Sequence, residues 1–265
     1  MAMHLGGWLE SIDPAGTPTP ITAMLDERLF TTGDNIRIKD LTEVLGMGVV
    51  ITSAADTLSE AYLYSPTLDI LGQSYITPVN ASTAPNVNGS IIRWADYMAN
   101  PIMLKYDELS RCYINALPGS AQVQAAFVLF SDGRRMEVPS GRHITWRGTF
   151  TAPPANLVWS AVNVTWQNEL VPGDYAIVGL KVVAPTTLAA RLNTRQSPQW
   201  YPGVLVSSSY DTIDPMYARP GMAGVWQTFP FTQPPSLEIC AVTGAAGQVY
   251  MDIVQVNEQP RVRSG

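Results

Sequence analysis

The sequence contains few of the side chains that carry out catalysis. Only 2 of its 265 residues are histidine and 2 are cysteine, and charged residues make up 14%. A Ser-His-Asp site would need either His4, in an expected N-terminal arm, or His143, which follows a turn. Neither a Gly-x-Ser-x-Gly elbow nor a complete glycine-rich phosphate loop occurs. We therefore predict that the protein is not an enzyme, and we name no catalytic, cofactor-binding or metal-binding residue.

Two weaker possibilities for binding or catalysis remain open. Asp211 and Asp214 lie in a polar loop and could bind calcium through their carboxylates, although a plain surface loop is the preferred interpretation. Trp200 and Tyr201 could form an exposed platform for a sugar, but aromatic residues more often pack in cores and interfaces. A glycan-active enzyme would need two facing carboxylates, and no pair stands out among the 22 acidic residues.

Positive charge and long apolar runs are also scarce. The net charge is −6 and the pI is about 4.9, which argues against binding nucleic acid through a folded basic face. No apolar run approaches the roughly 18 residues needed to span a membrane, and residues 1–8 lack the pattern of a signal peptide. The low charge content and the 21 prolines predict that much of the surface is buried against other chains.

What the sequence does contain is a series of strand-like segments separated by Gly, Pro, Asn and Asp. They are rich in Val, Ile, Thr and aromatic residues, and they span residues 48–53, 73–79, 122–130, 157–166, 175–184 and 248–256. A hairpin is predicted over 127–138, because Asp132-Gly133 favours a left-handed turn. Short helices are predicted at 57–63 and 93–98.

A weak internal repeat relates the two halves of the chain. The motif Leu-x-x-Cys, followed by a small-residue turn and Gln-Val, occurs at 109–123 and again at 237–249. Three further matches lie upstream of it, Val49 with Gly179, Ala61 with Ala190 and Trp94 with Trp226, at offsets of 130, 129 and 132 residues. Within the motif the offset is 128 at Cys112 and Cys240 and 126 at Gln122 and Gln248. The two cysteines are expected to be buried apolar side chains in separate cores, not a disulfide.

Two copies of about 125 residues, each with seven or eight short strands, suit the jelly roll. The predicted fold class is therefore all-β, with two tandem jelly-roll β-barrels (a double jelly roll) and short helices in loops. We predict an N-terminal arm at 1–20, a first jelly roll at 21–145, a second at 146–257 and a C-terminal tail at 258–265.

The tandem β-rich halves, the repeat at 109–130 and 237–256, the few charges and the many prolines resemble one family. It is the double jelly-roll major capsid proteins of tailless icosahedral bacteriophages. The resemblance covers most of residues 20–258 and includes no diagnostic motif. It implies a structural protein of the virion capsid, assembled in the host cytoplasm as pseudo-hexagonal homotrimers. It also implies contacts with other capsid proteins, such as vertex or minor proteins, and with any internal membrane, for which residues 1–8 are the better candidate.

Other classes of protein stay open at this point. A phage spike or a carbohydrate-binding β-sandwich module would expose an aromatic patch. A capsid subunit of the single jelly-roll type would require the two halves to form one elaborated domain. Sequence-specific nucleic-acid binding is not expected.

Overall fold

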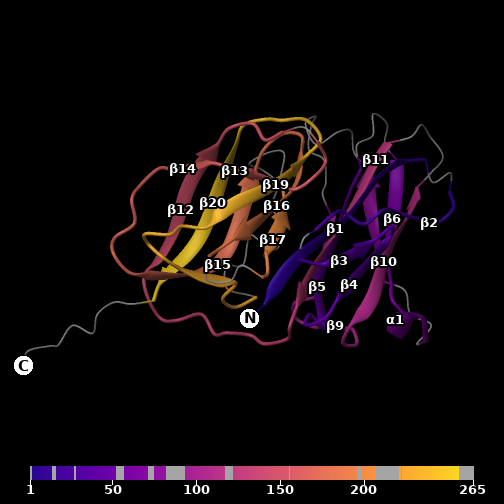
Figure 1. Cartoon of the computed structure of the whole chain (residues 1–265), viewed down its shortest axis with the longest axis horizontal. Helices are drawn as coiled ribbons and strands as arrows, with labels where there is room; N and C mark the ends of the chain where they lie inside the picture. The colour runs from indigo at the N-terminus through magenta and orange to yellow at the C-terminus, as the bar shows by residue number, and fades with distance from the viewer. Residues whose placement is uncertain are drawn as a thin grey trace, which may run out of the picture.

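The computed structural model describes residues 2–13, 16–26, 28–51, 57–70, 75–81, 93–116, 122–154, 156–195, 199–206, 221 and 223–256. Over these residues the chain is all-β, as predicted, with 20 strands in four sheets and one five-residue helix, α1 (Pro66–Ile70). Figure 1 shows the strands in two groups that lie side by side, one ending with β11 and the other beginning with β12.

The first group contains two sheets. The first sheet has the order β1 (Met3–Ile12), β11 (Gln122–Ser131), β5 (Glu43–Ile51) and β8 (Arg93–Asp96), with β9 (Ile102–Met103) also on β5. The second sheet has the order β3 (Phe30–Thr32), β4 (Asn35–Ile38), β10 (Glu108–Ala116), β6 (Thr57–Tyr64) and β7 (Tyr75–Ala81), with β2 (Thr19–Pro20) on β10.

The second group repeats this arrangement. The third sheet has the order β14 (Val164–Trp166), β12 (His143–Phe150), β20 (Gly247–Gln255), β15 (Asp174–Val183) and β18 (Gln227–Pro230). The fourth sheet has the order β13 (Ser160–Val162), β19 (Ser236–Ala241), β16 (Thr187–Asn193) and β17 (Gly203–Leu205).

The two groups share one strand order. If the short strands β2, β3, β9 and β14 are set aside and the others are counted along each group, one sheet reads 1-8-3-6 and its partner reads 2-7-4-5 in both groups. The residues matched in the sequence repeat lie on or next to equivalent strands. The match also preserves the pairing of neighbouring strands. Val49 pairs with Ala126 in the first group, and their counterparts in the repeat, Gly179 and Asp252, pair with each other in the second.

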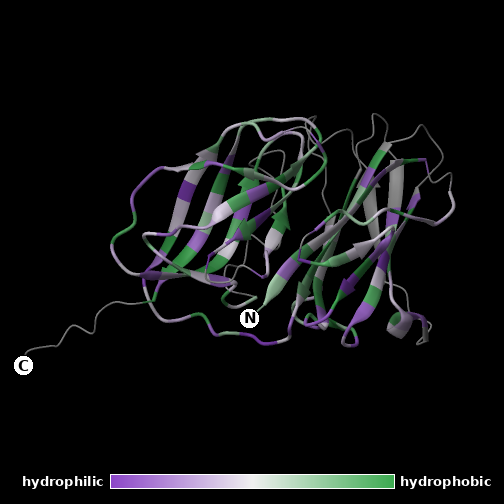
Figure 2. Cartoon of the chain, viewed as in Figure 1, coloured by the Kyte–Doolittle hydropathy of each residue, from purple (hydrophilic) through white to green (hydrophobic). Residues whose placement is uncertain are grey.

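The first sheet is buried on both faces, which explains the uninterrupted apolar run in β11. Ala126, Val128 and Phe130 point into the core between the first two sheets. Phe127 and Leu129 join a second core that extends into the second group. Strands covered on both faces read as continuous apolar runs, whereas half-buried strands alternate, and Figure 2 shows such alternating stripes on many of the other strands.

The predicted N-terminal arm is wrong, because residues 3–12 form β1. This strand pairs with β11 along its whole length, from Met3 opposite Ser131 to Ile12 opposite Gln122. At Gly7 the strand packs closely, because a β-carbon there would lie 2.9 Å from the Phe127 ring. The apolar side chains of Met3, Leu5 and Trp8 are buried in the fold. Contact between residues 1–8 and an internal membrane stays a prediction.

Both helices predicted from the sequence are strands in the structure. Residues 57–63 belong to β6, where Ala61 and Leu63 are buried and alternate with half-buried neighbours, and residues 93–96 form β8. β6 lies between two partner strands, β10 and β7. Pairing with both strands and the alternation of buried and half-buried side chains favour a strand over the helix that the residues could form in isolation. The predicted strand 157–166 is divided between β13 and β14, which belong to different sheets.

The predicted hairpin is only half present. Gly133 adopts the expected left-handed conformation, with φ of 74°. No strand follows over residues 134–142, and the chain instead crosses to β12, which begins at His143. The change from one group to the other therefore falls between Ser131 and His143, so the predicted boundary after residue 145 lies inside β12. The predicted tail at 258–265 lies outside the described residues.

Candidate functional site

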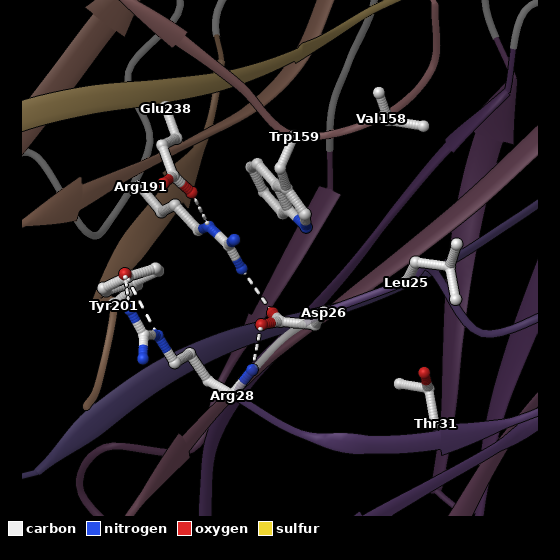
Figure 3. Close-up of a pocket in the computed structure, with 9 residues that line it drawn as sticks. All are labelled: Leu25, Asp26, Arg28, Thr31, Val158, Trp159, Arg191, Tyr201 and Glu238. Atoms are coloured by element: carbon white, nitrogen blue, oxygen red, sulfur yellow. Dashed lines mark hydrogen bonds and ion pairs between the residues drawn. The ribbon is translucent and has the colours of Figure 1, made fainter. Parts of the chain in front are cut away.

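A pocket of ≈ 490 Å³ opens where the two groups meet (Figure 3). The first group contributes the segment between β2 and β3 and the start of β3, and the second contributes the segment before β13 together with β16, β19 and the residues before β17. The side chains that line it are Leu25, Asp26, Arg28 and Thr31 from the first group and Val158, Trp159, Arg191, Tyr201 and Glu238 from the second.

Arg191 is the centre of a buried set of charges in this pocket. Its Nε donates a hydrogen bond to Glu238 Oε2 at 2.6 Å, and its Nη1 donates to Asp26 Oδ2 across the junction. The centre of the guanidinium group lies 4.3 Å from the Trp159 ring and 4.8 Å from the Tyr201 ring. A planar, delocalised cation can stack on aromatic faces while its edge binds carboxylates, so arginine suits this position better than lysine.

His4 extends the network into β1. Its Nε2 lies 2.9 Å from Asp26 Oδ2, and its Nδ1 lies 3.1 Å from the backbone nitrogen of Tyr201. A backbone N–H can only donate, so Nδ1 is the acceptor and the proton of a neutral ring is on Nε2. Burial lowers the pKa of His4 below its ordinary value, and this effect exceeds the opposing influence of Asp26. With both nitrogens occupied, His4 is a structural link and not a free base.

Asp26 is ionised and balances Arg191. Burial tends to raise the pKa of this carboxyl, but the hydrogen bond from His4, the charge of Arg191 and the Arg28 backbone N–H hold it well below its usual range. A buried charge is tolerated only when it is paired and hydrogen-bonded. The network therefore ties the two groups together in one arrangement.

A second set of contacts surrounds Tyr201. Its hydroxyl oxygen accepts hydrogen bonds from Arg28 Nη2 at 2.8 Å and from Asn193 Nδ2 at 3.0 Å. Tyr201 is 4% exposed, and Trp200 is half-buried beside the core of the first group. The expectation that these aromatic residues pack in the interior or at an interface is confirmed, and the exposed sugar platform at this place is wrong.

The other residues considered in the sequence lie elsewhere. His143 is exposed at the start of β12 and does not line the pocket. Asp211 and Asp214 lie outside the described residues. Across the described ranges, no three His, Cys, Asp or Glu side chains are grouped so that they could hold a metal ion. No helix in the described part of the chain is long and apolar enough to cross a membrane.

The two cysteines are buried and unbridged, as expected. Cys112 belongs to the core of the first group and Cys240 to the core that includes the second. Burial raises the pKa of the Cys240 thiol to about 12 and raises that of Cys112 as well. Neither thiol is therefore a reactive nucleophile at neutral pH.

A second concavity, of ≈ 530 Å³, lies in the second group and was not anticipated. Trp146 and Trp166 stack there with ring centroids 3.7 Å apart, and Phe231 and the polar segment 167–169 complete the lining. Trp166 is half-buried and Phe231 is 39% exposed.

No spacing in the sequence indicated that His4, Asp26 and Arg191 meet, because they are far apart along the chain. One signal was available in Leu188-Ala-Ala-Arg-Leu192, where a single charge interrupts an apolar strand. A charge in such a position implies a buried partner, but the sequence does not say which acid supplies it.

Comparisons of the chain with protein-family models, with curated proteins and with solved structures give no match.

Proposed function

We propose that the protein is a structural coat protein of a virus, a double jelly roll that self-associates into trimers and then into an icosahedral shell. It would act in the virion capsid, beside copies of itself and other capsid proteins, and would have no enzymatic activity. The trimer and the shell are what the resemblance to the capsid proteins of tailless icosahedral bacteriophages implies.

The observation that carries this proposal is the repeated strand order. A jelly roll joins eight strands so that the sheets read 1-8-3-6 and 2-7-4-5, and both groups have this order. Two jelly rolls in one chain allow a trimer to present six similar barrels, which suits a lattice of six-fold tiles.

The junction between the groups supports the same proposal. A capsid subunit must keep its two halves in one arrangement while neighbouring subunits bind to its edges. The core that extends from the first sheet into the second group, together with the paired charges of Asp26, Arg191 and Glu238, fixes the two barrels relative to one another. Both ring nitrogens of His4 are engaged, which favours a structural over a catalytic role for this network.

Negative-stain imaging of the purified chain at increasing concentration tests the proposal. We expect particles of hexagonal outline, then sheets or closed shells. Single two-lobed particles at every concentration, with no lattice, would contradict a coat function.

A second candidate function, carbohydrate binding, is favoured by the pocket at Trp146 and Trp166. Stacked aromatic rings beside the polar side chains of Gln167, Asn168 and Glu169 offer an apolar face and hydrogen-bonding groups, the combination that a sugar ring needs. A glycan array distinguishes the candidates, because saturable binding that Asn168→Ala weakens would support a receptor-binding module. The exposed Asn163→Ala is the matched control.

A further inference from the structure

We propose that the junction pocket and the pocket next to it form one groove that binds an extended segment of a second copy of this chain. The inference rests on the proposed self-assembly and assigns it a contact surface. The two pockets share Arg28, so they follow each other along the segment from Leu25 to Phe30.

The rim of this groove is unusually apolar for a solvent-exposed edge. Leu25 is 84% exposed, Phe30 is 63% exposed and Val158, on the opposite side, is 47% exposed. Figure 3 shows Leu25 and Val158, one from each group of strands, on the same side of Trp159. Apolar side chains gathered around a polar pocket mark a protein-binding surface, whereas scattered ones need no partner.

The wall of the groove holds a donor without an acceptor. The Trp159 indole nitrogen is buried and finds no hydrogen-bond partner among the residues that the structure describes. In Figure 3 this nitrogen points towards the space between Asp26, Leu25 and Val158. Buried donors are almost always satisfied, and a backbone carbonyl of an inserted segment would supply the acceptor.

The far end of the groove is positively charged. The adjoining pocket, of ≈ 350 Å³, is lined by three cations, Arg28, Arg37 and Lys39, against one acid, Asp40. Arg37 also lies 3.9 Å from Asp107, which leaves an excess of positive charge at this end. A chain with a net charge of −6 offers acidic surface to that end. The segment that fits would be extended, with an apolar side chain between Leu25 and Val158 and an acidic one near Arg37 and Lys39.

Cysteine protection tests the contact directly. Because Cys112 and Cys240 are buried, a maleimide should react selectively with an added surface cysteine. Leu25→Cys is placed in the groove, and Met136→Cys, at a residue that is 50% exposed and lines neither pocket, is the matched control. Labelling rates are measured over a dilution series while light scattering records the mass.

If the groove is the contact, the Leu25→Cys thiol is protected at least tenfold when the chain is assembled and becomes reactive on dilution, while Met136→Cys reacts equally throughout. Assembly with both positions equally reactive would overturn the groove and leave the coat function standing. A wild-type chain that never assembles would overturn the coat function itself.

Two further variants make the test independent of labelling. Leu25→Asp places a charge on the apolar rim and should shift the assembly midpoint to at least tenfold higher concentration. Trp159→Phe retains a ring over Arg191 but removes the N–H. This variant should also shift the assembly midpoint to higher concentration, by less than Leu25→Asp does. Unchanged assembly in both variants, with native circular dichroism, would contradict the inference.

Discussion

Arg191 links three parts of the molecule that the chain order keeps apart. It bonds Glu238 on the neighbouring strand and Asp26 of the other group, and it stacks between Trp159 and Tyr201. Replacing Arg191 with methionine would leave the Asp26 carboxylate buried without a cation. Loss of one partner of a buried pair costs about 3–5 kcal/mol, so we expect the free energy of unfolding in urea to fall by that amount.

The control for this variant is Arg147→Met. Arg147 is exposed and stacks on Tyr250, and the loss of such a surface contact should change stability by less than about 1 kcal/mol. Adding Asp26→Asn to Arg191→Met should restore part of the stability, since one unpaired charge is removed. Equal losses in Arg191→Met and Arg147→Met would show that the network is not important for folding.

His4 gives the stability a defined pH dependence. Its pKa in the folded chain lies below the ordinary value of 6.5, so between these two values the unfolded chain binds more protons than the folded one. The contribution of His4 to the free energy of unfolding should therefore be constant above pH 7 and fall as the pH drops through 6.5, by at most about 1.4 kcal/mol per pH unit.

Urea titrations between pH 5 and 8 measure this slope. His4→Gln should be less stable at pH 8 but should lack the slope below 6.5, because glutamine does not titrate. The exposed His143→Gln should retain it. A slope that persists unchanged in His4→Gln would contradict the neutral, doubly hydrogen-bonded histidine.

Two elements, β5 and β17, bring the groups into direct contact at a glycine. A β-carbon at Gly48 would lie 2.2 Å from Leu205 Cδ1 and 2.7 Å from the Trp94 ring. Gly48→Val should therefore destabilise the chain by about 1–3 kcal/mol through overpacking. Thermal denaturation checks this against Ala161→Val on the exposed position of β13, which should have little effect. A stable Gly48→Val variant would mean that the junction is loosely packed.

Elements with strong patterns were the ones that the sequence predicted well. The runs at 122–130, 175–184 and 248–256 correspond to β11, β15 and β20, which form the centres of their sheets. β1 was missed because Gly6-Gly7 and the polar Glu10-Ser11 do not look like a strand until a neighbour covers them. β6 was taken for a helix because its residues form either structure in isolation, and only tertiary pairing decides. The junction site depended on contacts between distant residues, which no local pattern records.

The whole molecule should unfold in one step. The core that contains Leu5 and Phe127 of the first group also contains Val204 and Met251 of the second, so neither group is complete without the other. Calorimetry should show a single transition with equal calorimetric and van't Hoff enthalpies. Two separate transitions would mean that the two groups of strands fold independently and that the junction is a weak contact.

Our central proposal is that this chain is a coat protein that associates with itself. The most direct measurement is the solution mass of the purified protein by light scattering across a wide range of concentrations. We expect a trimer of 28.8 kDa chains that grows into larger assemblies as concentration rises. A single chain of 28.8 kDa at every concentration would contradict it.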